Sequence, residues 1–127
     1  MAPVRRYLEE GMNIGLGSDV AGGTSENLFA AMAQSIQVSK LRWRLFDDSL
    51  KPLTIEEAFY MASKGGGAFF GKVGSFEPGY EFDAVVCDDS RLKHPQLLTV
   101  KQRLERIIYL GDEREVAGKY VEGRKMF

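Results

Sequence analysis

The stretch Gly17-Ser18-Asp19-Val20-Ala21-Gly22-Gly23 determines how the rest of the sequence is interpreted. A short apolar run at 12–16 leads into it, and a helical pattern begins near Ser25. This order predicts a strand over 12–17, then a turn and a helix, with Asp19 at the carboxyl end of the strand. Ligands and catalytic groups collect at that end in α/β sheets and barrels. Asp19 is therefore the candidate functional residue.

Alternation along the expected strand separates an apolar face from a small or polar face. The apolar face consists of Met12, Ile14 and Leu16. The other face consists of Asn13, Gly15, Gly17 and, if the extended path continues, Asp19. In a barrel the first face would pack on helices. The second would point inward, with the glycines leaving room beside Asp19.

Five helices, one of them short, and two further β regions are predicted around this stretch. Apolar spacing and end signals predict helices over 4–10, 25–42, 54–63 and 99–110. Thr54 with Glu57, and Thr99 with Gln102, match the capping box that opens a helix. The run 65–67 of three glycines predicts a helix break before a short helix at 68–71. A buried strand is expected at 82–87, and a hairpin is expected from 116–121 and 124–127.

Composition limits the classes of function. The chain has 127 residues and a formal net charge of −1, from 17 Lys and Arg against 18 Asp and Glu. No basic stripe suggests a nucleic-acid partner, and no apolar run approaches the roughly 20 residues of a membrane span. The first residues lack the apolar core of a signal peptide. A cytoplasmic protein with no membrane partner is expected.

The residues that usually bind metals are scarce. Cys87 is the single cysteine and lies in an apolar run, and His94 is the single histidine and precedes a proline. An inert strand position is expected for Cys87, and a surface loop for His94. The adjacent acids Asp88 and Asp89 are expected at a solvated strand end. Because zinc normally needs three or four ligands, no zinc cluster is visible in the sequence. The cytidine-deaminase type of zinc site is also excluded, since it needs a Cys-x-x-Cys pair.

The motifs resemble those of one enzyme family. The stretch 17–23 resembles the eighth-strand motif of guanine deaminases in the amidohydrolase superfamily, G-T-D-V-A/S-G-G, with Ser18 in place of threonine. Residues 53–66 resemble the "LT-x-x-EA…AT-x-GG" helix, and 74–84 resemble the turn and strand that follow it. Residues 106–112 and 120–124 are similar to the family's C-terminal ending. The resemblance covers nearly the whole chain, and its first and last segments are the more specific ones.

This resemblance implies a fold and a division of the chain. The expected fold class is α/β: the last βα portion of an amidohydrolase (β/α)8 barrel plus part of the small composite β-sandwich domain. Residues 1–74 would supply the barrel portion. Residues 75–127 would supply part of the small β domain, with one helix. Since a complete (β/α)8 barrel takes roughly 250 residues, this chain has room for only one or two barrel units.

The resemblance also implies a chemistry for Asp19. In the family a single Zn²⁺ lies at the mouth of the barrel, and the eighth-strand aspartate is both a metal ligand and a catalytic group. Asp19 would accept a proton from the attacking water, whose pKa the metal lowers. The hydroxide would add at C2 of the purine base guanine, and ammonia would leave to give xanthine.

The sequence departs from the family because most of the implied site is missing. The HxH pair, two later histidines and the proton-shuttling Glu have no counterpart here. The chain is therefore interpreted as a C-terminal fragment of a guanine deaminase-like enzyme, inactive alone and without tightly bound zinc. The alternatives are a fragment of another amidohydrolase deaminase or chlorohydrolase, or a non-catalytic structural or oligomerisation module. Exposed strand edges and apolar faces predict a homo-oligomer.

Overall fold

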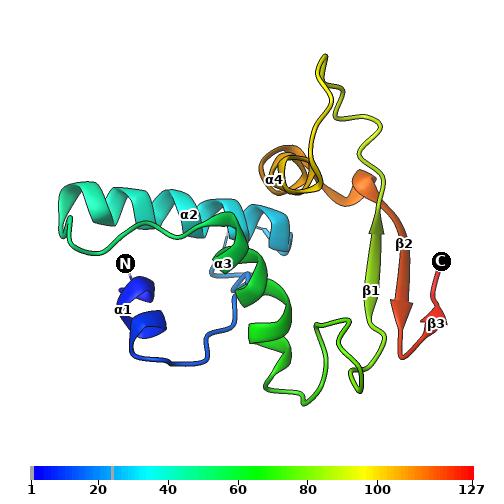
Figure 1. The fold of residues 1–127 in the computed structure, drawn as a ribbon, viewed down its shortest axis with the longest axis horizontal. Coiled ribbons are helices and arrows are strands. Elements are labelled where there is room, and N and C mark those ends of the chain that lie inside the picture. Colours follow the sequence, from blue (N-terminus) through cyan, green and yellow to red (C-terminus); the bar gives the residue numbers. More distant parts are fainter. Residues whose placement is uncertain (1, 24) are drawn as a thin grey trace.

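The computed structural model describes residues 2–23 and 25–127. Its helices gather on one side and its small sheet stands on the other, with the C-terminus beside the last strand (Figure 1). The elements in chain order are α1 (Val4–Glu9), α2 (Leu28–Leu45), α3 (Ile55–Tyr60), the π-helical turn η1 (Met61–Gly65), β1 (Ala84–Cys87), α4 (Val100–Leu110), the 3₁₀ turn η2 (Glu113–Glu115), β2 (Val116–Val121) and β3 (Arg124–Lys125). No helix in the described ranges is long and apolar enough to cross a membrane.

The core lies between the helices. Apolar residues four apart on α2, Met32 and Ile36, are buried, as the sequence predicts. They belong to one cluster with Leu53, Ile55, Ala58, Met61 and Ile108. The cluster therefore joins α2, α3, η1 and α4. The buried apolar residues of the described chain include none from the sheet.

Both predicted capping boxes are confirmed. The Thr54 side chain accepts from the Glu57 backbone N–H while the Glu57 carboxylate accepts from the Thr54 N–H, and α3 begins there. The same reciprocal pair, Thr99 with Gln102, opens α4. Apolar spacing in α4 predicts that Val100, Ile107 and Ile108 face the core. The two isoleucines are buried, but Val100 is exposed, so its predicted burial was wrong. Val100 lies in the first turn of α4.

The predicted strand over 12–17 is not formed. This segment is extended but is not assigned as a strand. Its backbone is linked to the helices by hydrogen bonds from the Met12 N–H to the Tyr7 carbonyl at 2.9 Å and from the Leu16 N–H to the Met61 carbonyl at 2.8 Å. Alternation is nevertheless preserved in part, because Ile14 and Leu16 pack against the core cluster. A strand needs a neighbouring strand, and the segment lies against η1 instead.

The predicted break at the three glycines was also wrong. Helical backbone continues through 66–67, and the expected helix at 68–71 is a turn. Close approach explains the glycines better. A Cβ on Gly65 would lie 2.5 Å from the Ile14 carbonyl oxygen, and a Cβ on Gly15 would lie 2.9 Å from Gly66 Cα. The absence of side chains at these positions lets segment 12–17 lie directly on the helix.

The sheet is antiparallel, with strand order β1-β2-β3. The predicted hairpin is confirmed, although β3 is short. In β1, Ala84 pairs with Tyr120 and Val86 with Gly118, and a bulge follows Val86. Burial of this strand was predicted wrongly, since both of its valines are exposed. No helix of the described chain packs broadly on the sheet (Figure 1).

Candidate functional site

Asp19 lies in a tight loop that follows the extended segment. Its carbonyl oxygen accepts the Gly22 N–H at 2.9 Å and also the Gly23 N–H. An isolated bridge joins Val20 and Gly23 across the loop. The loop thus folds back on Asp19, and the Asp19 side chain is exposed to solvent.

The loop holds two non-glycine residues in the left-handed region. The φ angle is 49° at Asp19 and 83° at Ala21. Aspartate tolerates this region because its short polar side chain can bond locally, whereas alanine pays a steric cost. Such strain persists only where the surroundings enforce it, and it concentrates at functional sites. The backbone therefore marks this loop as a candidate site, independently of the motif.

The two glycines after Ala21 give the Asp19 carboxylate its position. A Cβ on Gly22 would lie 2.7 Å from the Asp19 Oδ2 atom, and a Cβ on Gly23 would lie 2.0 Å from the Ser18 carbonyl oxygen. The carboxylate therefore occupies the space that a side chain at position 22 would fill. The sequence analysis selected Asp19 as a candidate but did not predict that Gly22 leaves room for its carboxylate. The pair Gly22-Gly23 was the sequence signal for this arrangement.

The segment that leads to Asp19 is anchored on η1. The Asn13 Nδ2 donates to the Gly65 carbonyl at 3.2 Å, and Leu16 bonds to Met61 as described above. Asn13 was expected to share a face with Asp19. In the structure its side-chain amide is hydrogen-bonded to Gly65. The anchor ties the loop to the helical core, which fixes where Asp19 emerges.

The described residues do not by themselves fit a zinc ion. They contain no group of three or more His, Cys, Asp or Glu side chains that could hold a metal. His94 is exposed in the loop before α4, and Cys87 is half-buried on β1, both as predicted. Burial raises the pKa of the Cys87 thiol, which disfavours the thiolate that a metal needs. Asp19 thus offers a single carboxylate where zinc normally takes three or four ligands.

The two acids after β1 make hydrogen bonds within the chain. Arg103 on α4 donates to both oxygens of Asp89 at 2.7 Å, and this pairing lowers the pKa of Asp89. The Asp88 Oδ1 accepts the Ser90 N–H at 2.9 Å. Asp88 is exposed, which agrees with the predicted solvated strand end. The Asp89–Arg103 pair links that strand end to α4.

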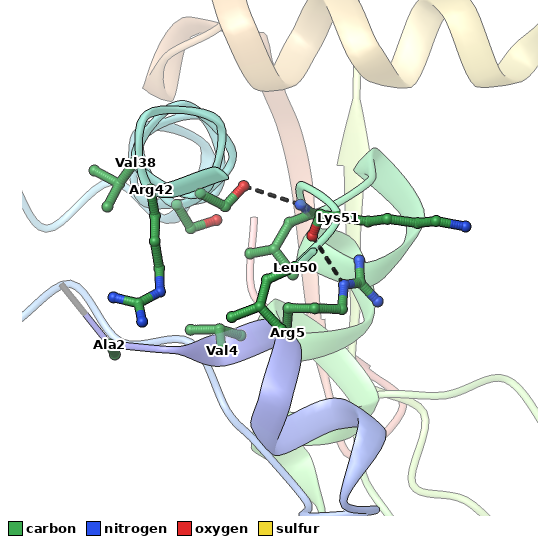
Figure 2. A pocket seen from close by; sticks show the side chains of 10 residues that line it. Ala2, Val4, Arg5, Val38, Arg42, Leu50 and Lys51 are labelled. Carbon is green, nitrogen blue, oxygen red and sulfur yellow. Dashed lines mark hydrogen bonds between the residues drawn. The ribbon is translucent and has the colours of Figure 1, made fainter. Parts of the chain in front are cut away.

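A small cavity lies away from Asp19, between α1, α2 and the loop 50–53 (Figure 2). Its volume is about 110 Å³, and its lining includes Val4, Val38 and Leu53. Arg5 also borders it, but its guanidinium is bonded to Glu57. Because no residue of the Asp19 loop lines the cavity, it does not extend the candidate site.

The fold and this loop define a class of protein. A model of the amidohydrolase family matches residues 1–126, and the chain belongs to that family. The similar proteins within it are guanine deaminases. Identity is 34% to guanine deaminase of Dictyostelium discoideum and 31% to that of Homo sapiens, each match covering 97% of this chain and 29% of the relative.

Solved structures give the same result. Guanine deaminase from C. acetobutylicum, solved with bound guanine in the active site, is 50% identical with a TM-score of 0.94. That match covers 100% of this chain and 30% of the other. E. coli guanine deaminase is 26% identical with a TM-score of 0.82. The chain therefore spans about 30% of the length of the relatives it matches.

Proposed function

We propose that this chain supplies the Asp19-bearing portion of a guanine deaminase-type amidohydrolase, which hydrolyses guanine to xanthine and ammonia. One observation carries the proposal. The whole chain superposes on a guanine deaminase holding guanine, and the loop with Asp19 and Ala21 in the left-handed region presents an exposed carboxylate. In this proposal residues 1–74 belong to the barrel and residues 75–127 to the small β domain.

Asp19 is proposed as the catalytic carboxylate of that reaction. An exposed carboxylate can accept a proton from a water molecule positioned beside it. Gly22 leaves the space in which this carboxylate lies. A zinc site around Asp19 would need two or three further ligands. These ligands would have to come from the roughly 70% of a guanine deaminase chain that this chain does not match.

The isolated chain is accordingly proposed to be inactive. One carboxylate neither binds zinc tightly nor contacts the whole of a purine base. Purified chain with added Zn²⁺ and guanine should form no xanthine, and measurable turnover would overturn this statement. A cytoplasmic location and self-association remain predictions from the sequence.

A chimera tests the activity itself. This chain would replace the matched 30% of the C. acetobutylicum guanine deaminase. The chimera should deaminate guanine, and Asp19→Asn should lower kcat at least about a hundredfold, as expected for loss of an acid–base group. Asparagine suits this test because it also tolerates the left-handed backbone at position 19. Asp48→Asn, at an exposed position outside the loop, is the matched control. A folded chimera without activity would favour a non-catalytic module instead.

A further inference from the structure

The helix that receives segment 12–17 is widened where the two meet. η1 is a π-helical turn that directly follows α3, and its Met61 carbonyl accepts the Gly66 N–H five residues further on. Turns of this kind are rare and occur frequently at functional sites. The partner of this turn is the segment that leads to Asp19, which indicates a role for η1 in the candidate site.

Two hydrogen bonds fix the register of the segment on η1. The Leu16 N–H donates to the carbonyl of the first residue of η1, Met61, at 2.8 Å. The Asn13 Nδ2 donates to the carbonyl of the last residue, Gly65, at 3.2 Å. Because successive residues of an extended chain advance about 3.3 Å and point to opposite faces, a shift by one residue would break both bonds.

The backbones between these two bonds are too close for side chains. A Cβ on Gly65 would lie 2.5 Å from the Ile14 carbonyl oxygen, and a Cβ on Gly15 would lie 2.9 Å from Gly66 Cα. This approach sets how closely the segment lies on the helix, but glycines offer no side chains that could interlock and stop it from sliding. The register therefore depends on the hydrogen bonds. One of them uses a backbone N–H, and the other depends on the identity of Asn13.

We propose that Asn13 is a positioning residue for the Asp19 carboxylate. Its amide holds segment 12–17 in register on η1, and Asp19 follows the second anchored residue, Leu16, by three positions. A displacement of the segment along η1 therefore moves the carboxylate. The proposal rests on the proposed function for the reaction that Asp19 serves, although the hold on the segment is measured without activity.

Amide hydrogen exchange of the intact chain, followed by NMR, tests the hold on the segment. Asn13→Asp keeps the shape of the side chain but has no N–H to donate. Exchange of the Leu16 N–H should become about fivefold faster, as expected for the loss of one hydrogen bond. The Gly22 N–H, which donates to the Asp19 carbonyl, should also exchange faster, because the loop moves with the segment. Asn13→Gln keeps an amide donor and should restore part of the protection.

The chimera with the C. acetobutylicum enzyme tests the effect on the reaction. Asn13→Asp in the chimera should lower kcat about tenfold and change KM less than about twofold, because the carboxylate is misplaced in the transition state while guanine still binds. Asn13→Gln should recover part of kcat. Arg91→Ala is the matched control, because it breaks an ion pair with Glu115 outside segment 12–17 and η1. It should lower stability and leave kcat unchanged.

Three results would overturn the proposal. These are unchanged exchange at Leu16 and Gly22 in Asn13→Asp, an unchanged kcat of the Asn13→Asp chimera, or an equal loss of kcat in Arg91→Ala. The last result would attribute the effect to stability alone. A folded chimera that is inactive before any substitution would contradict the proposed function, whereas the exchange rates would still show whether Asn13 holds the segment.

Discussion

Arg5 and Glu57 form a two-pronged ion pair across 52 positions of sequence. The Arg5 Nη1 and Nη2 atoms donate to Glu57 Oε1 and Oε2, both at 2.6 Å. The same guanidinium donates to the Lys51 and Pro52 carbonyls at 3.0 Å. The Glu57 carboxylate also closes the capping box on Thr54. One pair therefore ties α1 to the start of α3 and to the loop before it.

Arg5→Lys should lower the free energy of unfolding by about 1–2 kcal/mol. Lysine keeps the charge but cannot donate in two parallel directions or reach both carbonyls. Urea unfolding followed by circular dichroism measures the effect. Arg6→Lys is the control, because Arg6 is exposed and its contact with Asp47 is 4.0 Å long. Equal losses of unfolding free energy in the two variants would show that the paired hydrogen bonds between Arg5 and Glu57 do not stabilise the fold.

The pair also predicts an acid-dependent loss of stability. Hydrogen bonding from Arg5 lowers the pKa of Glu57 below its usual 4.5. A carboxyl with a lowered pKa stabilises the folded state above its unfolded pKa, and this contribution is lost as the pH falls through the folded pKa. Lys101 lowers the pKa of Glu56 to about 2, but this pair is exposed and solvent screening leaves it little weight in the stability.

Glu57→Gln measures how much Glu57 contributes to the acid-dependent loss of stability. The difference in unfolding free energy between the original chain and this variant should be constant above about pH 5 and should shrink below about pH 4.5. Urea titrations at each pH provide the measurement. Glu10→Gln, which removes a carboxylate from an exposed position just after α1, is the control. A difference that grows as the pH falls would contradict the assignment.

Gly65→Ala has two opposing effects on stability, one from helix propensity and one from packing. Alanine in a helical position normally gains about 0.5–1 kcal/mol over glycine. Here its Cβ would lie 2.5 Å from the Ile14 carbonyl oxygen, and crowding of this kind costs about 1–3 kcal/mol. We expect net destabilisation, measured by urea unfolding. Gly17→Ala is the control, since a Cβ there meets nothing within 4 Å. Stabilisation by Gly65→Ala would show that segment 12–17 moves away without cost.

Local signals explain what could be predicted from sequence. The capping boxes at Thr54 and Thr99 need only residues three apart, so they were readable directly. The apolar spacing of Met32 and Ile36 likewise determines which side of α2 is buried. Asp19 was selected as a candidate because a polar residue ends an apolar run before two glycines, and its role stays a prediction.

Long-range contacts explain what could not be predicted. Segment 12–17 has the composition of a strand, but its partner is η1, which no local pattern identifies. From the sequence alone, Gly65 predicts a helix break. The close approach of the Ile14 carbonyl, which explains this glycine, is visible only in the structure. The exposure of Val85 could not be predicted either, because burial of an apolar strand depends on which other elements pack on it. The left-handed conformation of Ala21 is imposed by loop closure, since alanine itself disfavours it.

Arg91→Ala should destabilise the chain because it isolates a buried carboxylate. Glu115 is 1% exposed, and its oxygens accept from Arg91 Nη1 at 3.1 Å and from the Asp112 N–H at 2.8 Å. Removing one partner of a buried ion pair is costly. Since Arg91 itself is half exposed, water can replace part of the lost interaction, and we expect a loss of about 1–3 kcal/mol.

Two variants make the Arg91 result specific to the buried charge. Arg103→Ala, which breaks the more exposed pair with Asp89, should cost less in the same urea experiment. The double variant Arg91→Ala with Glu115→Gln should recover part of the loss, because a neutral amide no longer carries an unpaired buried charge while it can still accept the Asp112 N–H. If the double variant is no more stable than Arg91→Ala alone, the loss comes from Arg91 packing and not from the orphaned carboxylate.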